Sequence, residues 1–240
     1  MRLLIATPRK SGNAQLRCLL ASAYGLELIN SRSAPDGSDF AEITTWLGEL
    51  PERSVVHTSF RYTSQLKTLA TKLGINLVTV LRHPFDLFVT IYDVAQHRAE
   101  KKGPQPEAAV SWIHLAGKEL DHPDVLAYLR EGFSEEIDWL MEWHDSGVPV
   151  LRFELLAADP FQALSGLTSH LGPPDDDAVG RAVENCPGEN KVRTSLVRGR
   201  PTPMPIVSTG AWRERLNDDH VAILRDRYGD DVRQLGYELA

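Results

Sequence analysis

A short basic loop near the N-terminus carries the residues best suited to bind an anion. The loop combines two cations with two small residues: Arg9, Lys10, Ser11 and Gly12. An apolar run at residues 3–6 precedes it, and apolar side chains recur at helical spacing over residues 16–23 behind it. A strand that enters a helix through such a loop gathers free backbone N–H groups and the positive end of the helix dipole around one point, where Lys10 adds a full charge. The pattern indicates an anion site, although an ordinary strand–loop–helix connection with a surface lysine has the same local pattern.

The segments around this loop alternate between strand and helix. Apolar runs predict strands at residues 3–6, 26–29, 54–57, 75–81 and 148–153. Helical periodicity and capping signals predict helices over 40–50, 65–73, 133–144 and 161–171, and a last helix with Asn217 or Asp218 as its cap. Strands separated by helices are typical of βαβ units, so we expect an α/β protein with a mainly parallel sheet and helices on both faces.

Composition limits the class of protein. The 240 residues suit one globular domain over 1–240, with 42% hydrophobic and 25% charged side chains. No apolar run reaches the roughly 18–20 residues of a membrane helix, and no cleavable leader is recognised. Cys18 and Cys186 do not make a disulfide framework. We therefore expect a cytoplasmic protein that does not bind a membrane, and the formal net charge of −7 argues against non-specific nucleic-acid binding.

Five stretches, in the same order along the chain, resemble the motifs of the sulfotransferases that use 3′-phosphoadenosine 5′-phosphosulfate (PAPS). PRKSGNAQ at 8–15 resembles the family's phosphosulfate loop P-K-S-G-T-T-W. RHPFD at 82–86, with Thr90, resembles its R-x-P-x-D motif and the serine eight residues after the arginine. The other three stretches lie toward the C-terminus: LRFE at 151–154 with DP at 159–160, RGR at 198–200 with GAWR at 210–213, and LGYE at 235–238. Together they cover nearly the whole chain.

The resemblance implies a three-layer α/β/α fold, similar to that of the P-loop nucleotide kinases, and transfer of a sulfuryl group from PAPS to a hydroxyl group of a small or medium acceptor. It implies that PAPS, and its product adenosine 3′,5′-bisphosphate (PAP), is bound without a metal by these residues: Arg9, Lys10, Ser11, Gly12, Asn13, Ala14, Arg82, Thr90, Arg198, Gly199 and Arg200. Lys10 is also a predicted catalytic residue, because it would neutralise the bridging oxygen as the S–O bond breaks. The forked guanidinium of Arg82 and the hydroxyl of Thr90 would hold the 3′-phosphate.

The sequence departs from the family pattern at three places. Arg9 is inserted in the loop, and Gln15 stands where many relatives stack a tryptophan on the adenine. At the third place, Ser59 occupies the position of the family's catalytic histidine, while His57 lies two residues earlier on the same face of the expected strand. Imidazole suits a general base because its pKa is near neutrality, so His57 is the predicted base. The alternatives are a carboxylate near Glu107, an acceptor that needs little help from a base, and a histidine that only caps the strand.

Two other functions fit part of the pattern. A nucleotide-dependent kinase of similar fold is opposed by the missing G-x-x-x-x-G-K-[ST] loop and by the lack of an apolar strand that ends in a clear magnesium-binding aspartate. A non-catalytic nucleotide-binding relative is favoured by the serine at position 59. Arg198 and Arg200 fit solvated loop charges nearly as well as phosphate ligands, and Trp212 fits core packing as well as ligand contact. The acceptor and the oligomeric state have no signal in the sequence.

Overall fold

A computed structural model describes residues 1–8, 10–30, 33–102, 112–175, 177–186 and 208–239. The chain divides into two compact units: unit 1, residues 1–82 and 142–201, and unit 2, residues 83–141 and 202–240. None of the helices in the described residues is long and apolar enough to cross a membrane. A single domain over 1–240 and a cytoplasmic location stay predictions.

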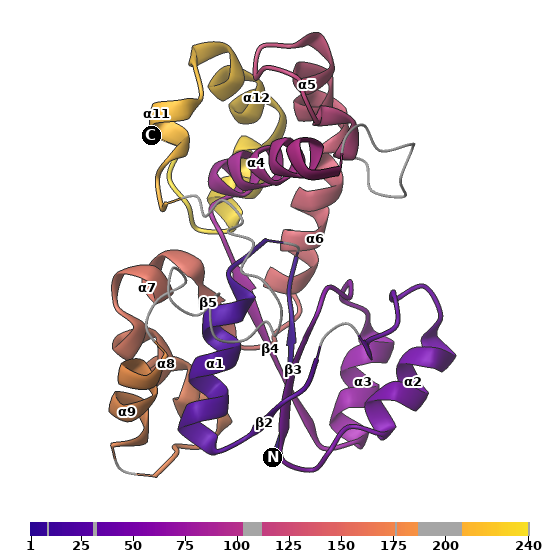
Figure 1. Cartoon of the computed structure of the whole chain (residues 1–240), viewed down its shortest axis with the longest axis vertical. Helices are drawn as coiled ribbons and strands as arrows, with labels where there is room; N and C mark the ends of the chain where they lie inside the picture. The colour runs from indigo at the N-terminus through magenta and orange to yellow at the C-terminus, as the bar shows by residue number, and fades with distance from the viewer. Residues whose placement is uncertain (9, 31–32, 103–111, 176, 187–207, 240) are drawn as a thin grey trace. The chain divides into compact units, whose positions relative to one another are not determined.

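Unit 1 is built on a parallel sheet whose described strands run in the order β2–β3–β1–β4–β5. These strands are β1 Arg2–Ala6, β2 Glu27–Leu28, β3 Ser54–Thr58, β4 Ile75–Leu81 and β5 Val150–Arg152. Helices cover both faces, which confirms the predicted α/β class (Figure 1). On one side lie α1 Asn13–Tyr24, α8 Pro160–Leu171 and α9 Ala178–Asn185; on the other lie α2 Phe40–Gly48 and α3 Ser64–Lys72.

Apolar side chains on both faces of β1 hold it in the middle of the sheet. Leu3 and Ile5 join the core cluster that contains Leu16 and Leu20 of α1. Leu4 is also fully buried but lies outside that cluster, because successive side chains of a strand point to opposite faces. A strand covered on both faces reads as a continuous apolar run, which is the pattern that predicted it.

A disulfide joins Cys18 of α1 to Cys186, the residue after α9, across a sequence separation of 168. The two Cα atoms are 5.9 Å apart. The two cysteines were not predicted to form a disulfide framework, and the structure joins them in this bond. Spacing alone could not reveal it, because the two cysteines meet only when α9 packs against α1. Disulfides are uncommon in cytosolic proteins.

The described residues of unit 2 form helices. They are α4 Pro84–Lys102, η2 Ile113–Leu115, α5 Pro123–Ala127, the π-turn η3 Tyr128–Gly132, the first part of α6 Ser134–His144, α11 Trp212–Arg215 and α12 Asp218–Gln234. The ring of Phe133 packs edge-on against Phe88 and Tyr228, each with centroids 5.7 Å apart. Asn217 caps α12 as predicted: its side chain accepts a hydrogen bond from the backbone N–H of His220 at 3.1 Å.

Candidate functional site

The predicted anion loop follows β1 at the carboxyl edge of the sheet. Because the described strands of the sheet run parallel, His57 near the end of β3 and Arg82 directly after β4 lie at this same edge. β1 lies between β3 and β4, where the order of the strands along the chain changes direction. Ligands of open α/β sheets bind outside the carboxyl ends of the strands at such a switch point. The fold of unit 1 therefore brings Lys10, His57 and Arg82 together.

Two left-handed residues shape the loop. Lys10 has φ +70° and Gly12 has φ +89°. Gly12 is the N-cap of α1 and supplies no side-chain cap, so the first N–H groups of the helix, from Asn13 onward, remain available to another acceptor. Between them Ser11 is fully buried, and its hydroxyl has no hydrogen-bond partner among the described residues. Donors that converge in this way form an anion-binding concavity.

Gly12 is also the point where the loop meets the start of α7. A Cβ atom at this position would lie 2.3 Å from Cδ2 of Phe153, the first residue of α7 (Phe153–Ala158). Real Cβ atoms do not approach a ring so closely, and the φ of +89° disfavours a side chain as well. The loop can pass over Phe153 only because residue 12 is glycine.

We expect Gly12→Ala to lower the free energy of unfolding by about 2–3 kcal/mol, from backbone strain and from the clash with Phe153. Urea unfolding of the purified variant measures this value. Gly166→Ala in α8 is the matched control, because a Cβ there meets no atom within 4 Å. Equal effects of the two substitutions would contradict the close packing at Gly12.

Arg82 braces the loop from the end of β4. Its side chain is buried, only 2% exposed, and its guanidinium lies over the ring of Phe153, 4.3 Å from the centroid. Nη1 donates a hydrogen bond to the carbonyl oxygen of Lys10 at 3.4 Å. Arg82 is therefore a buried residue that contacts the loop directly.

His57 belongs to a short hydrogen-bonded chain. The hydroxyl of Thr7 donates to Oδ1 of Asn13 at 2.8 Å, and Nδ2 of Asn13 donates to Nε2 of His57. Because an amide nitrogen only donates, this bond assigns the acceptor role to Nε2 and the imidazole proton to Nδ1. The histidine is thereby held neutral and in one tautomer.

The pKa of His57 is lowered from 6.5 to about 3, mainly by burial and also by the positive charges of Arg17 and Lys10. At neutral pH the imidazole is therefore unprotonated, as a base must be. The low pKa nevertheless makes the neutral imidazole a weaker proton acceptor than an ordinary histidine.

The predicted site residues that follow Arg82 in the sequence lie in unit 2 or outside the described part of the chain. Thr90 lies in unit 2, where its hydroxyl donates to the carbonyl oxygen of Asp86 at 2.8 Å. The buried carboxylate of Asp86 accepts hydrogen bonds from the backbone N–H groups of Gly210, at 2.7 Å, and Trp212, at 3.1 Å. Trp212 itself is buried and stacks on His83, which favours the core-packing interpretation of this tryptophan. The following predicted residues lie outside the described part of the chain: Arg9, Arg198, Gly199, Arg200 and, as the alternative base, Glu107.

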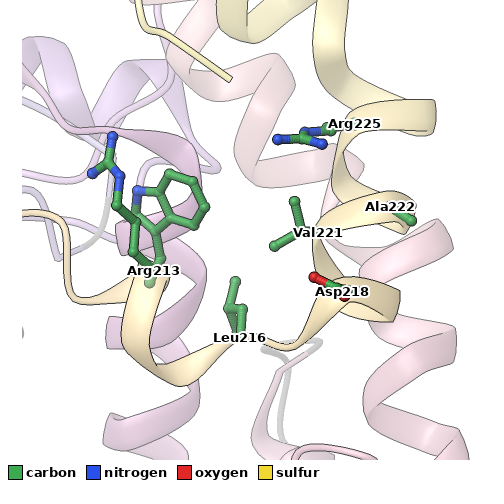
Figure 2. Close-up of a pocket in the computed structure, with 7 residues that line it drawn as sticks. Arg213, Leu216, Asp218, Val221, Ala222 and Arg225 are labelled. Atoms are coloured by element: carbon green, nitrogen blue, oxygen red, sulfur yellow. The ribbon is translucent and has the colours of Figure 1, made fainter. Parts of the chain in front are cut away.

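Unit 2 has a hollow of about 380 Å³ beside Trp212, between α11 and α12 (Figure 2). Its two arginines are engaged by the protein: the guanidinium of Arg213 lies 4.6 Å from the centroid of the Trp212 ring, and Arg225 donates two hydrogen bonds to the carbonyl oxygen of Leu239. We assign no ligand to this hollow.

In the residues that the structure describes, no group of three His, Cys, Asp or Glu side chains could hold a metal ion.

Three features of the site were missed from the sequence. Phe153 was noticed only as part of the LRFE stretch, and its contact with Gly12 depends on the pairing of β4 with β5. The link between Asn13 and His57 depends on α1 lying beside β3. Arg17 carried a usable signal, because it follows Asn13 by four residues and so shares its face of the helix.

Solved structures with the same fold include sulfotransferases. Mouse sulfotransferase SULT7A1, complexed with PAP, superposes with a TM-score of 0.68 and 15% sequence identity, over 98% of this chain and 88% of that one. Retinol dehydratase superposes with TM-scores of 0.60, in a complex with androsterone and inactive cofactor PAP, and 0.58, in a complex with retinol and PAP. Those identities are 13% and 14%, over 97% of this chain and 82% of each. No family model matches the sequence, and neither does any curated protein.

The chain therefore has the fold of the sulfotransferases, and the fold class predicted from the five motif-like stretches is confirmed. At 13–15% identity the likeness concerns the fold. The roles of individual residues come from the geometry of the site.

Proposed function

We propose that this protein is a sulfotransferase that moves a sulfuryl group from PAPS to a hydroxyl group of a small or medium acceptor. The observation that carries the proposal is the loop between β1 and α1. There Lys10, an uncapped helix N-terminus and the buried hydroxyl of Ser11, which has no hydrogen-bond partner among the described residues, converge. PAP in three structures of the same fold supports the choice of nucleotide, and retinol and androsterone in two of them support a hydroxyl-bearing acceptor.

PAPS supplies an activated sulfuryl group on a phosphate that can leave. In the proposed site, Lys10 and the amides of residues 11–14 hold the phosphosulfate, and Lys10 neutralises the bridging oxygen that keeps the electron pair of the broken S–O bond. The acceptor oxygen forms the new bond to sulfur, and its proton passes to Nε2 of His57 after the amide of Asn13 releases that nitrogen. Arg82 holds the 3′-phosphate and steadies the loop.

The low pKa of His57 fits this scheme because Lys10 and Arg17, two of its causes, are cations. Anions that bind beside these residues compensate their charge and raise the pKa of His57 toward the range of a useful base. The proposed base is therefore weak in the free protein and strengthened in the complex.

A non-catalytic nucleotide-binding protein is the second candidate. It is favoured by one observation, the engagement of His57 Nε2 by Asn13, which leaves the nitrogen occupied in the free protein. Thermal-shift measurements with PAP, with ATP and magnesium, and with ATP alone test the nucleotide class. A shift with PAP that needs no metal supports both candidates, and turnover with PAPS and a panel of hydroxyl compounds separates them. A shift with ATP and magnesium, together with no shift with PAP, would favour a kinase and overturn the proposal.

We expect Arg82→Ala to weaken PAP binding by about 10- to 150-fold, because a charged hydrogen-bonding partner of the 3′-phosphate contributes roughly 1.5–3 kcal/mol. Isothermal titration measures the affinity. Adenosine 5′-phosphosulfate, which lacks the 3′-phosphate, is the control ligand and should lose much less. If both ligands weaken alike, Arg82 acts through the Lys10 carbonyl and the loop, and the 3′-phosphate assignment is wrong.

A further inference from the structure

Thr7 is a fully buried polar residue at the end of β1, just before the predicted phosphosulfate loop. Its backbone N–H donates to the carbonyl oxygen of Thr58 at 3.2 Å, so Thr7 continues the pairing of β1 with β3. Its hydroxyl donates to Oδ1 of Asn13 at 2.8 Å, and among the described residues this is the one hydrogen bond that the hydroxyl makes. The side chain is therefore fixed by a strand end and acts on the site through Asn13.

The tautomer of His57 is decided at one ring nitrogen. Nε2 accepts a hydrogen bond from the side-chain amide of Asn13, whereas Nδ1 makes no hydrogen bond within the part of the chain that the structure describes. No carboxylate or carbonyl oxygen among the described residues therefore fixes the proton on Nδ1 directly. The group that faces Nε2 decides instead: an N–H group there makes Nε2 the acceptor, and an oxygen atom there would make it the donor.

Thr7 determines which end of the Asn13 amide faces His57. The oxygen and nitrogen atoms of a side-chain amide exchange places by a half-turn, so Asn13 could present either of them. In the observed orientation the hydroxyl of Thr7 donates to Oδ1, which leaves Nδ2 on the side of His57. After a half-turn the buried hydroxyl would lose the acceptor of its proton among the described residues. An unsatisfied buried donor disfavours that orientation by about tenfold or more.

We propose that Thr7 is a positioning residue for the sulfuryl transfer: through Asn13 it keeps the imidazole proton of His57 on Nδ1 and the lone pair on Nε2. This inference rests on the proposed function, because it assigns a residue that prepares the base of the same site. Asn13 is the first residue of α1, directly after Gly12, so Nε2 faces the helix N-terminus where the phosphosulfate would bind. The acceptor hydroxyl replaces the amide as the donor to Nε2 and gives up its proton there. In the other tautomer Nε2 carries a proton already and cannot accept one.

NMR of the protein labelled with nitrogen-15 in its histidines tests the proposal, because protonated and unprotonated ring nitrogens give well-separated signals. His57→Ala assigns the signals of His57. We expect the wild type at about pH 7.5 to carry its proton on Nδ1. Thr7→Val removes the hydroxyl at nearly constant volume, so it should move the proton to Nε2 in a measurable fraction of the molecules. It should lower kcat by about tenfold and leave PAP affinity within about twofold. Thr7→Ser keeps a hydroxyl and should retain the wild-type signals and rate.

Thr79→Val is the matched control for Thr7→Val. Thr79 is also a fully buried threonine, but its hydroxyl has no hydrogen-bond partner among the described residues. The same substitution there should leave the signals of His57 and kcat unchanged. Asn13→Asp is the complementary variant, because a carboxylate only accepts hydrogen bonds and should place a proton on Nε2 whatever residue occupies position 7. It decides the role of the amide even if Thr7→Val does not fold.

Several results would overturn the proposal. A proton on Nε2 in the wild type does so, as does an unchanged proton position in Thr7→Val or in Asn13→Asp. A moved proton without a loss of kcat removes the positioning role, and equal losses of kcat in Thr7→Val and Thr79→Val make Thr7 a structural residue only. A wild type that binds PAP but transfers no sulfuryl group contradicts the proposed function instead. The NMR signals still decide in that case whether Thr7 sets the tautomer of His57.

Discussion

Replacing Lys10 by alanine is expected to lower turnover by about 10²–10³, because one donor to the charge that develops in the transition state is lost. The bridging oxygen becomes fully charged only as the S–O bond breaks, so PAP affinity should fall much less than the rate. Steady-state rates with saturating PAPS and isothermal titration with PAP measure the two quantities.

Lys72→Ala provides the control for Lys10→Ala, since this exposed lysine in the last turn of α3 is not part of the site. Its rate and PAP affinity should match those of the wild type. Equal losses of rate and PAP affinity in Lys10→Ala would show that Lys10 only anchors the nucleotide and is not catalytic.

His57→Ala is the second substitution with a large expected effect, a loss of about 10²–10⁴ in turnover with PAP affinity nearly unchanged. Ser59→Ala should cost little, because a serine hydroxyl without an activating neighbour is a poor base. A fully active but less stable His57→Ala protein would sink the base assignment and direct attention to the carboxylate alternative near Glu107.

The same residue makes a signed prediction about pH. The pKa of His57 is lowered to about 3 in the folded protein, whereas the unfolded chain has the ordinary value near 6.5, so the unfolded state binds the proton first. The contribution of His57 to the free energy of unfolding is fully present above about pH 6.5 and is lost as the pH falls toward 3. Between pH 7.5 and pH 5 we expect the free energy of unfolding to fall by about 2 kcal/mol from this group. Urea unfolding at these two pH values should show a smaller difference for His57→Ala than for the wild type. A wild type and variant with parallel pH dependence would exclude the low pKa.

The strands could be predicted because buried strands of a parallel sheet are continuous apolar runs in the sequence. The run 75–81 is the strand β4 residue for residue, and the runs at 3–6 and 54–57 each fall one residue short of β1 and β3. The run 148–153 was predicted too long, since the structure confines β5 to Val150–Arg152 and begins α7 at Phe153. Periodicity cannot separate a strand end from a following helix that stays buried, as Phe153 does.

The site was predictable where one segment supplies the chemistry and unpredictable where two segments share it. The loop around Lys10 and Gly12 is local, so its residue types indicated its conformation. The Asn13–His57 hydrogen bond joins residues 44 positions apart, and no local sequence pattern predicts such a contact. The pKa of His57 depends on burial and on two cations from another segment, so an ordinary imidazole pKa was the wrong guide to its strength.

The disulfide between Cys18 and Cys186 has a consequence for how ligands of this protein must be sought. A cross-link over 168 positions limits the unfolded chain and contributes, by the loop-entropy relation, about 5 kcal/mol to stability. A ligand present at one hundred times its dissociation constant contributes only about 2.7 kcal/mol. In a partly reduced sample, the change in melting temperature caused by loss of the disulfide would therefore exceed the change caused by nucleotide binding. The redox buffer is the first variable to fix in any binding screen.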